Sequence, residues 1–427
     1  MSLILHNLRL SFIITFDLGS FDFERDIIDS LDSFLIFGIT PTLEYKNYSD
    51  DVYDHELIRL SNPIPTLKVE IDDVKQFFHE YVENQVEDEC YSFYKSISKI
   101  IVLLSFDQKG IISIRIDFYP KLEDSIETPQ LIKILSQTCT LVDETLFPKY
   151  LKNKIRELHH QENSILLEIH ETYSIVSSIN ADIIYKDELK PEIFGIVWKD
   201  EDYKNIDHAT LERVTENEIG LYKTDIFTIA TPAALLVCEG ENLKLDKEYI
   251  EERINSIEIF CRQQHLLKKL DVKLDKIIKK YDTEGIGNVN SVMDEIKDTQ
   301  IDIQSSLEFY RNTKIYGVDF FITLFETLNA VFRLDKYYNS VLDKLNACES
   351  LYRGLYEERG NKLKENIQWI VVLIWLTSIL IQLLLMVYGP TYGPDQTKII
   401  FIIVVLVLSS GFILIIFRNI IKKFFEG

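Results

Sequence analysis

Ser378 and Gln382 are the two polar residues near the C-terminus whose types and spacing could do chemistry in an apolar setting. They lie four residues apart, so in a helix they share one face. A hydroxyl and an amide on one face can replace part of the water shell of an ion. They can equally hydrogen-bond between two packed helices. The sequence leaves both interpretations open, and the elements around the pair must decide between them.

Motifs for catalysis and metal binding are weak elsewhere in the chain. His159, His160, Glu162 and His170 lie close together but lack the HExxH spacing of a zinc site, so surface histidines are the simpler interpretation. The Gly285–Gly287 pair lacks the third glycine of a dinucleotide fingerprint, and the sequence has no Gly-Lys-Ser/Thr element of a P-loop. We therefore predict that the protein is not an enzyme, and the sequence identifies no ligand-binding or metal-binding residues.

The Ser/Gln pair lies in the first of two long apolar stretches, Ile367–Val387 and Ile399–Phe417, joined by the loop Tyr388–Lys398. Neither stretch contains a charged residue. As helices they would be about 31 Å and about 28 Å long, close to the roughly 30 Å of a bilayer core. The sequence predicts a C-terminal transmembrane hairpin of two helices.

Basic residues flank this predicted hairpin on its outer sides. Positive charge favours the cytoplasmic side, so both termini are expected in the cytoplasm and the protein in the inner or plasma membrane. Met1–Leu18 lacks the pattern of a signal peptide, and five separated cysteines fit reduced thiols. The flanking basic residues are Arg359, Lys362, Lys364, Arg418, Lys422 and Lys423.

Residues 1–245 alternate between strand-like and helix-like patterns, which predicts an α+β cytoplasmic domain with a largely antiparallel sheet. Apolar residues recur with period two at Leu8–Phe16, and Ile100–Phe106 and Ile111–Phe118 flank a turn. The formal charge of −22 argues against direct nucleic-acid binding. Further strands are expected at Ile165–Ile169, Ile193–Trp198, Ile226–Ile229 and Ala234–Cys238, and helices at Ile71–Ser98 and Pro129–Glu157.

Long helices follow the α+β domain. Asp246–Tyr281 is predicted to be a single helix, within a helical pair at residues 246–317. A stalk helix at 318–366 is expected to run without a break into the span at 367–387. After it come the outer loop 388–398, the second span 399–417 and a basic tail 418–427. The stalk carries apolar residues at heptad-like spacing, namely Leu324, Leu328, Val331, Tyr338, Leu342, Leu345, Tyr352 and Tyr356.

This order of elements resembles the CorA family of metal-ion transporters. Family members carry Tyr/Phe-Gly-Met-Asn at the outer pore mouth, and this chain has Tyr388-Gly389 followed by Pro390-Thr391. The resemblance implies a homo-oligomer, a pentamer, in a lipid bilayer, with the first span lining the pore. It implies an outer mouth formed by Tyr388, Gly389, Pro390, Thr391 and Asp395.

Under this resemblance, the face of the Ser/Gln pair becomes the pore lining. We expect Val371, Trp375, Ser378, Gln382 and Leu385 to line the pore, with a hydrophobic constriction at Val371 or Trp375. Packing between helices remains the alternative for Ser378 and Gln382.

The replacement of Met-Asn by Pro390-Thr391 bears on which function of the family this chain would have. Thr391 offers a hydroxyl where the family has an amide carbonyl, which weakens the argument for Mg²⁺ selectivity. The chain thereby resembles CorA-like membrane effectors of type III CRISPR systems, which implies gating by a nucleotide-derived second messenger such as SAM-AMP. The alternatives are a divalent-cation (Mg/Co/Ni-type) transporter of the CorA family and a membrane-anchored scaffold or signalling protein.

Overall fold

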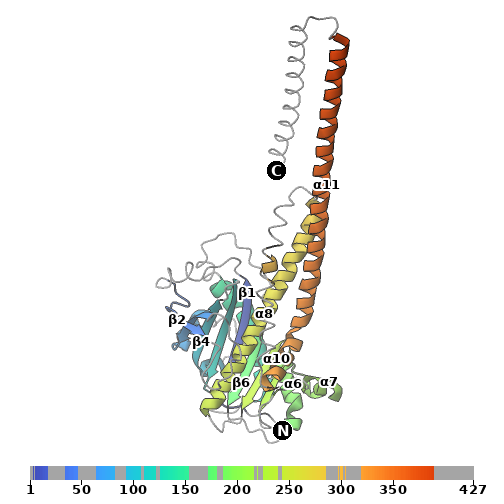
Figure 1. Ribbon diagram of the computed structural model, residues 1–427. Coiled ribbons are helices and arrows are strands. Elements are labelled where there is room, and N and C mark those ends of the chain that lie inside the picture. Colours follow the sequence, from blue (N-terminus) through green and yellow to red (C-terminus); the bar gives the residue numbers. More distant parts are fainter. Residues whose placement is uncertain are drawn as a thin grey trace. The chain divides into compact units, whose positions relative to one another are not determined.

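The computed structural model divides into two compact units, Met1–Val272 with Ile301–Val341 and Lys273–Gln300 with Leu342–Gly427. Figure 1 shows the two long helices α8 (Leu243–Glu284) and α11 (Leu334–Tyr388). Each of them contributes residues to both units. The residues that the structure describes are 3, 5–17, 34–46, 64–81, 93–106, 110–121, 126–152, 172–179, 186–215, 219, 225–238, 243–284, 297, 299–301, 303 and 319–388.

The first unit is built on a mixed sheet of eight strands in the order β2-β3-β4-β5-β1-β6-β8-β7. Neighbouring strands pair antiparallel, apart from the parallel pair β6 and β8. The α+β class expected for the N-terminal part agrees with this sheet. The strands are β1 (Arg9–Asp17), β2 (Thr42–Lys46), β3 (Ile64–Ile71), β4 (Ile97–Phe106), β5 (Ile111–Pro120), β6 (Thr172–Ile179), β7 (Ile226–Ile229) and β8 (Ala233–Cys238).

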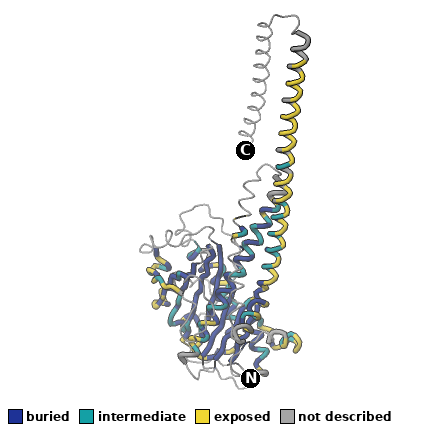
Figure 2. Tube along the Cα trace, in the orientation of Figure 1, coloured by how far each residue is buried: buried dark blue, intermediate teal, exposed yellow. Residues whose placement is uncertain are grey.

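Helices cover both faces of the sheet, because the strands bury side chains on both sides. In the central strand β1, Leu10, Phe12, Ile14 and Phe16 belong to the core that includes α2 (Val74–Tyr81), α4 (Thr128–Leu141) and α6 (Lys190–Trp198). Ile13 belongs to the other core, with residues of α8 and of α10 (Asp319–Phe332). Figure 2 shows the sheet as the most continuously buried part of the described chain.

Shorter elements complete the first unit. A π-helix, η2 (Val142–Leu151), continues directly from α4, and α7 (His208–Thr215) follows α6. Two 3-10 turns, η3 (Lys186–Leu189) and η4 (Tyr203–Asn205), flank α6.

The second unit contains the end of α8 and most of α11. Lys344 of α11 forms an ion pair with Asp275 of α8 at 2.8 Å, and Gln300 donates a hydrogen bond to Glu349. Farther along α11 the described residues become exposed, and the trace is yellow there in Figure 2.

Several sequence predictions are confirmed by these elements, including the strands at Leu8–Phe16, Ile100–Phe106 and Ile111–Phe118 and the helix at Asp246–Tyr281. The predicted strand at Ile193–Trp198 is wrong, since these residues form α6. Pro191 lies in the first turn of this helix, where its fixed φ is compatible with helical structure. The helix is buried, and a buried helix can be apolar on all sides, so its sequence lacks the polar face of a surface helix. The helix expected over Ile71–Ser98 is wrong at both ends, because Ile71 belongs to β3 and Ser98 to β4. Residues 82–92 and the predicted strand Ile165–Ile169 lie outside the described residues.

The expected unbroken stalk helix is interrupted at Arg333. This residue has φ +53°, a left-handed conformation that ends α10 before α11 begins at Leu334. Gln264 of α8 donates a hydrogen bond of 2.8 Å to the carbonyl of Phe332, and Asn329 donates one of 2.6 Å to Asp335. The tertiary contacts of the first unit therefore stabilise a break that heptad spacing alone did not indicate.

The predicted transmembrane hairpin is corrected by the structure. Among the described residues, no helix combines the length and the apolar character needed to cross a bilayer. Residues 367–387, expected as the first span, are the C-terminal part of α11, and earlier turns of this helix carry charged residues such as Glu357 and Lys364. The loop after Tyr388 and the stretch Ile399–Phe417 lie outside the described residues.

Candidate functional site

The predicted pore-lining residues all fall on α11. Val371, Trp375, Ser378 and Gln382 have exposed side chains, and helical spacing puts them on one face. Leu385 belongs to the same helix. Tyr388 is the last residue of α11, whereas Gly389, Pro390, Thr391 and Asp395 lie outside the described residues.

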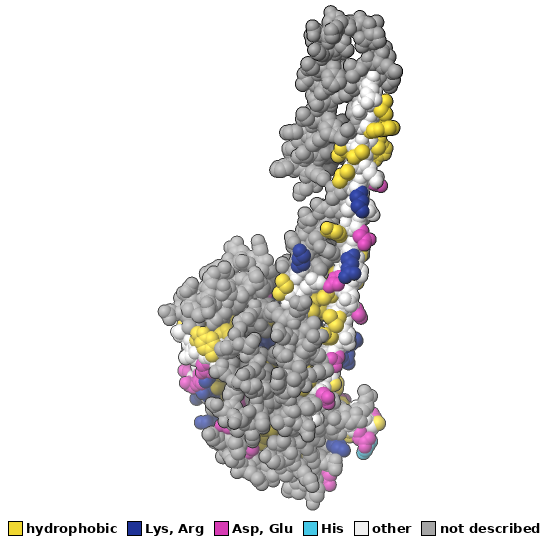
Figure 3. Space-filling view, in the orientation of Figure 1, with side chains coloured by type: hydrophobic (Ala, Val, Ile, Leu, Met, Phe, Trp, Pro, Cys, Tyr) yellow, Lys and Arg dark blue, Asp and Glu magenta, His cyan; other side chains and the backbone are white. Residues whose placement is uncertain are grey.

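Large apolar side chains are exposed around this whole part of α11. Trp369 and Trp375 are 67 % and 68 % exposed. Figure 3 shows hydrophobic side chains gathered on this stretch of the helix, beyond a more charged stretch. Contiguous apolar surface of this kind marks a site that contacts protein or lipid. The exposed apolar side chains are Ile367, Trp369, Ile370, Val371, Val372, Trp375, Leu376 and Ile379.

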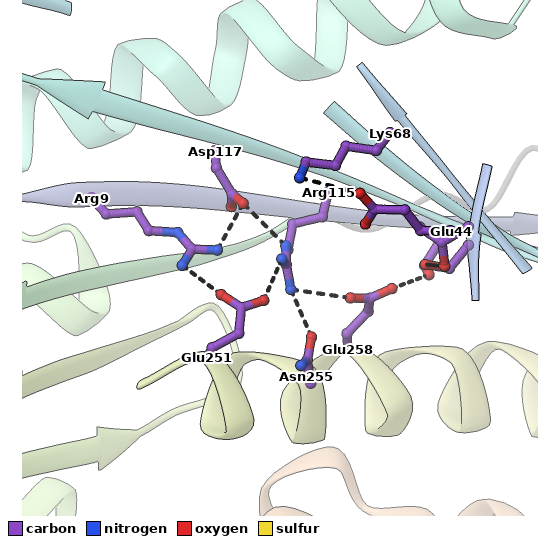
Figure 4. Close-up of polar contacts among 11 residues, drawn as sticks. Arg9, Glu44, Lys68, Arg115, Asp117, Glu251, Asn255 and Glu258 are labelled. Carbon is purple, nitrogen blue, oxygen red and sulfur yellow. Dashed lines mark hydrogen bonds and ion pairs between the residues drawn. The ribbon is translucent and has the colours of Figure 1, made fainter. Parts of the chain in front are cut away.

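A second candidate feature lies inside the first unit, where a buried ionic network joins the sheet to α8 (Figure 4). Arg9 comes from β1, and Arg115 and Asp117 come from the adjacent strand β5. Glu251 and Glu258 come from α8. Two arginines thus face three carboxylates, and the network carries one excess formal negative charge.

Arg9 bridges the two elements at one side of the network. Its guanidinium lies 2.7 Å from Asp117 Oδ2 and 2.7 Å from Glu251 Oε2. It also lies over the ring of Tyr119, 5.4 Å from the ring centroid, a favourable cation–π arrangement. Arg9 is therefore held by the sheet and by α8 together.

Arg115 is the centre of the network. Its Nη2 lies 2.6 Å from Glu251 Oε1, and its Nη1 donates a hydrogen bond of 2.9 Å to Asn255 and lies 3.5 Å from Glu258. Its Nε lies 3.2 Å from Asp117 Oδ2. A residue that contacts three positions of one helix fixes the rotation of that helix on the sheet.

Glu258 and Asp117 are the most deeply buried acids of the network, with 0 % and 1 % of the side chain exposed. Ser113 of β5 donates a hydrogen bond of 2.6 Å to Glu258 Oε1. Within the part of the chain that the structure describes, Asp117 Oδ1 and Arg9 Nε are buried without a hydrogen-bond partner. A bound water or a polar ligand group would satisfy each of these two atoms.

Electrostatics holds the network in its charged form. Burial by itself raises the pKa of Glu251, but Arg115 and Arg9 outweigh burial and bring this pKa well below its ordinary value. Burial alone lowers the pKa of Arg115, yet the charges of Asp117, Glu251 and Glu258 raise it above its ordinary value. Burial raises the pKa of Tyr119 as well, with a further contribution from Asp117.

A separate ion pair, outside the network, holds α8 at the other end of β1. Lys269 of α8 lies 2.6 Å from Asp17. From Arg9 to Asp17 an extended strand spans about 27 Å, and from Glu251 to Lys269 a helix also spans about 27 Å. The helix therefore runs along β1 in the same direction, with ionic contacts at both ends of the strand.

Sequence reasoning did not identify this network. The pattern at β1 predicted a strand with one polar face, and a polar face is ordinarily solvated. The available signal was the run Arg9, Ser11, Thr15 and Asp17 on that face, facing a helix with acids at heptad-like spacing. No local pattern pairs two segments that are 242 residues apart.

The sequence analysis identified no metal-binding residues and interpreted the histidine cluster as surface histidines. The cluster around His159 and His160 lies outside the described residues. Over the described ranges, the structure contains no group of three or more His, Cys, Asp or Glu side chains placed to hold a metal ion.

Comparison with known proteins gives no family for this chain. No protein-family model matches the sequence, and no curated protein matches it significantly.

Proposed function

We propose that this chain is an oligomeric membrane effector of the CorA-like type, which lets ions pass under the control of a nucleotide-derived ligand. It would act at the inner or plasma membrane with its α+β unit in the cytoplasm. The observation that carries the proposal is the exposed apolar surface of α11 from Ile367 to Ile379.

That surface requires an apolar environment. The exposed positions fall on all sides of the helix, so one packed partner helix would leave part of them in water. Lipid together with further copies of the chain can cover every side.

Control by a ligand is supported by α8. This helix is held to the sheet by Arg9, Arg115 and Lys269–Asp17, and its own residues continue into the second unit. A ligand that shifts the sheet or its ionic contacts would move α8, because packed elements respond as rigid bodies. We place the action of such a ligand at Arg9 and Asp117, because each has one buried polar atom without a hydrogen-bond partner among the described residues.

Binding to vesicles tests the lipid contact. Each tryptophan side chain can bury about 200 Å² of surface in lipid. At ~25 cal/mol per Å², this burial contributes several kcal/mol to the free energy of binding. We expect the full-length protein to float with liposomes, and the double variant Trp369→Glu/Trp375→Glu to lose at least tenfold of this binding. The matched control Glu357→Gln changes an exposed polar position of the same helix and should bind like the wild type.

Ion flux tests the effector activity. Liposomes that carry the full-length protein should release trapped ions only after SAM-AMP or a related adenine nucleotide is added. Mg²⁺ flux without any nucleotide would favour the divalent-cation transporter instead. Vesicle binding without flux under either condition would favour the scaffold or signalling protein, and a protein that neither floats nor self-associates would contradict all three.

A further inference from the structure

Lys199 and Cys139 form a close contact on the face of the sheet opposite α8. The Nζ atom of Lys199 lies 2.8 Å from Sγ of Cys139. That separation is typical of a hydrogen bond to oxygen, and sulfur is a larger atom. The two residues come from different helices, Cys139 from α4 and Lys199 from the end of α6.

Helix packing sets this contact. A side chain at Gly195 of α6 would meet Ile132 of α4 at 2.9 Å, so the two helices approach closely there. Cys139 lies seven residues after Ile132, and Lys199 lies four residues after Gly195, so each reactive residue shares the contacting face of its helix. The approach of the helices therefore brings the amine to the thiol.

Lys199 also has an unusual backbone conformation. Its φ of +56° and ψ of +39° put it in the left-handed region, and its N–H bonds to the carbonyl of Gly195 as the helix ends. A left-handed conformation is unfavourable for a residue with a side chain, so surrounding contacts must stabilise it. The contact with Cys139 is one of them.

We propose that Cys139 and Lys199 form a covalent N–O–S bridge under oxidising conditions, which makes them a redox-sensitive cross-link between α4 and α6. One oxygen atom inserted between Nζ and Sγ fills a gap of this size without movement of either helix. The oxidant is dioxygen. One N–H bond of the neutral amine and the S–H bond break, N–O and O–S bonds form, and the second oxygen atom leaves as water. Nitrogen and sulfur each lose two electrons, and dioxygen gains four.

The environment of the Cys139 thiol affects the rate of this reaction. Burial raises the pKa of the Cys139 thiol, and Lys199 opposes this only in part. The thiol is therefore largely protonated at neutral pH, and thiol oxidation proceeds through the thiolate. The cross-link should form slowly near neutral pH and faster as the pH rises, because the thiol must lose its proton before it is oxidised.

Peptide mass spectrometry of the full-length protein tests the bridge. Trypsin should not cleave after a bridged Lys199, so Ile134–Lys149 should appear joined to Asp187–Lys204. The joined peptide should be about 14 Da heavier than the two peptides together, for one oxygen gained and two hydrogens lost. Dithiothreitol should release both peptides unmodified.

Matched variants make the test specific. Lys199→Arg keeps the positive charge and Cys139→Ser keeps a hydrogen-bonding group, and each should abolish the joined peptide. Cys238→Ser removes a different cysteine, which is buried, and should leave the joined peptide unchanged. The inference is overturned if aerobic protein at alkaline pH gives the two peptides separately, or if Cys139 appears only as sulfenic or sulfinic acid. Either outcome leaves the proposed membrane function untouched.

Discussion

Arg115 shows how a single buried charge can specify the arrangement of two elements. Only 3 % of its side chain is exposed, and it contacts Glu251, Asn255 and Glu258 on α8 as well as Asp117 on its own strand. Buried ion pairs contribute little net stability compared with apolar packing, but they are costly to break. Their effect here is to favour one register of α8 on the sheet.

Replacing Arg115 with methionine should therefore destabilise the first unit. Asp117 and Glu258 would remain buried with less compensation, which costs about 3–5 kcal/mol. Hydrogen exchange of the full-length protein, followed in the amides of β5 and α8, measures the loss.

Lys68→Met is the matched control for this change. Lys68 pairs with Glu44 and Glu70, whose side chains are 51 % and 40 % exposed, and pairs of this kind contribute less than about 1 kcal/mol. Adding Glu258→Gln to the Arg115→Met variant should restore part of the protection, because it removes a buried charge. Equal exchange in Arg115→Met and Lys68→Met would contradict the role given to the network.

At the scale of elements, two helical glycines have different roles: Gly195 allows close packing, whereas Gly354 affects only helix propensity. A Cβ atom at Gly195 would lie 2.7 Å from Tyr203 and 2.9 Å from Ile132, whereas one at Gly354 on α11 would meet no described atom within 4 Å. Gly195→Ala should destabilise the packing of α4 and α6 by about 1–3 kcal/mol. Gly354→Ala should stabilise α11 by about 0.5–1 kcal/mol, because glycine is a poor helix former.

The two substitutions are controls for each other in one experiment. Amide exchange should become faster in α4 and α6 for Gly195→Ala and slower around position 354 for Gly354→Ala. Protection that is unchanged in α4 and α6 would mean that Tyr203 moves aside at little cost.

Some helices and strands could be predicted from sequence patterns alone, and others could not. The period-two pattern of β1 and the long helical pattern of α8 were predicted because each depends on neighbouring residues alone. Residues 193–198 have an apolar pattern that strand and buried helix share, and only their packing between neighbours resolved it. The break at Arg333 likewise depends on Gln264, which lies on another helix.

At the scale of the whole molecule, acid should destabilise the chain partly through Glu251. Its folded pKa lies below the ordinary value of 4.5, so its contribution is fully present above that pH and is lost as the pH falls toward the folded pKa. Its side chain is 39 % exposed, so solvent screens part of the effect. Glu251→Gln should be less stable than the wild type at neutral pH and should lose less stability between neutral pH and acid.

Thermal unfolding of the full-length protein across this pH range checks the prediction. Glu357→Gln replaces an exposed carboxylate and should follow the wild-type curve. Parallel curves for wild type and Glu251→Gln would show that the ion pairs of Glu251 do not contribute to the acid sensitivity.

The sequence alone determined the elements whose patterns are local: the strand at Arg9–Asp17, the paired strands β4 and β5, and the long helix α8. It also identified the apolar residues after Ile367, although the predicted transmembrane hairpin was wrong. Only the tertiary structure decided that the polar face of β1 is covered and that Arg9 and Arg115 meet Glu251. It also decided that Lys199 meets Cys139. The physical reason is that periodicity reports which side of an element is apolar, whereas the group that neutralises a buried charge is chosen by contacts between distant segments.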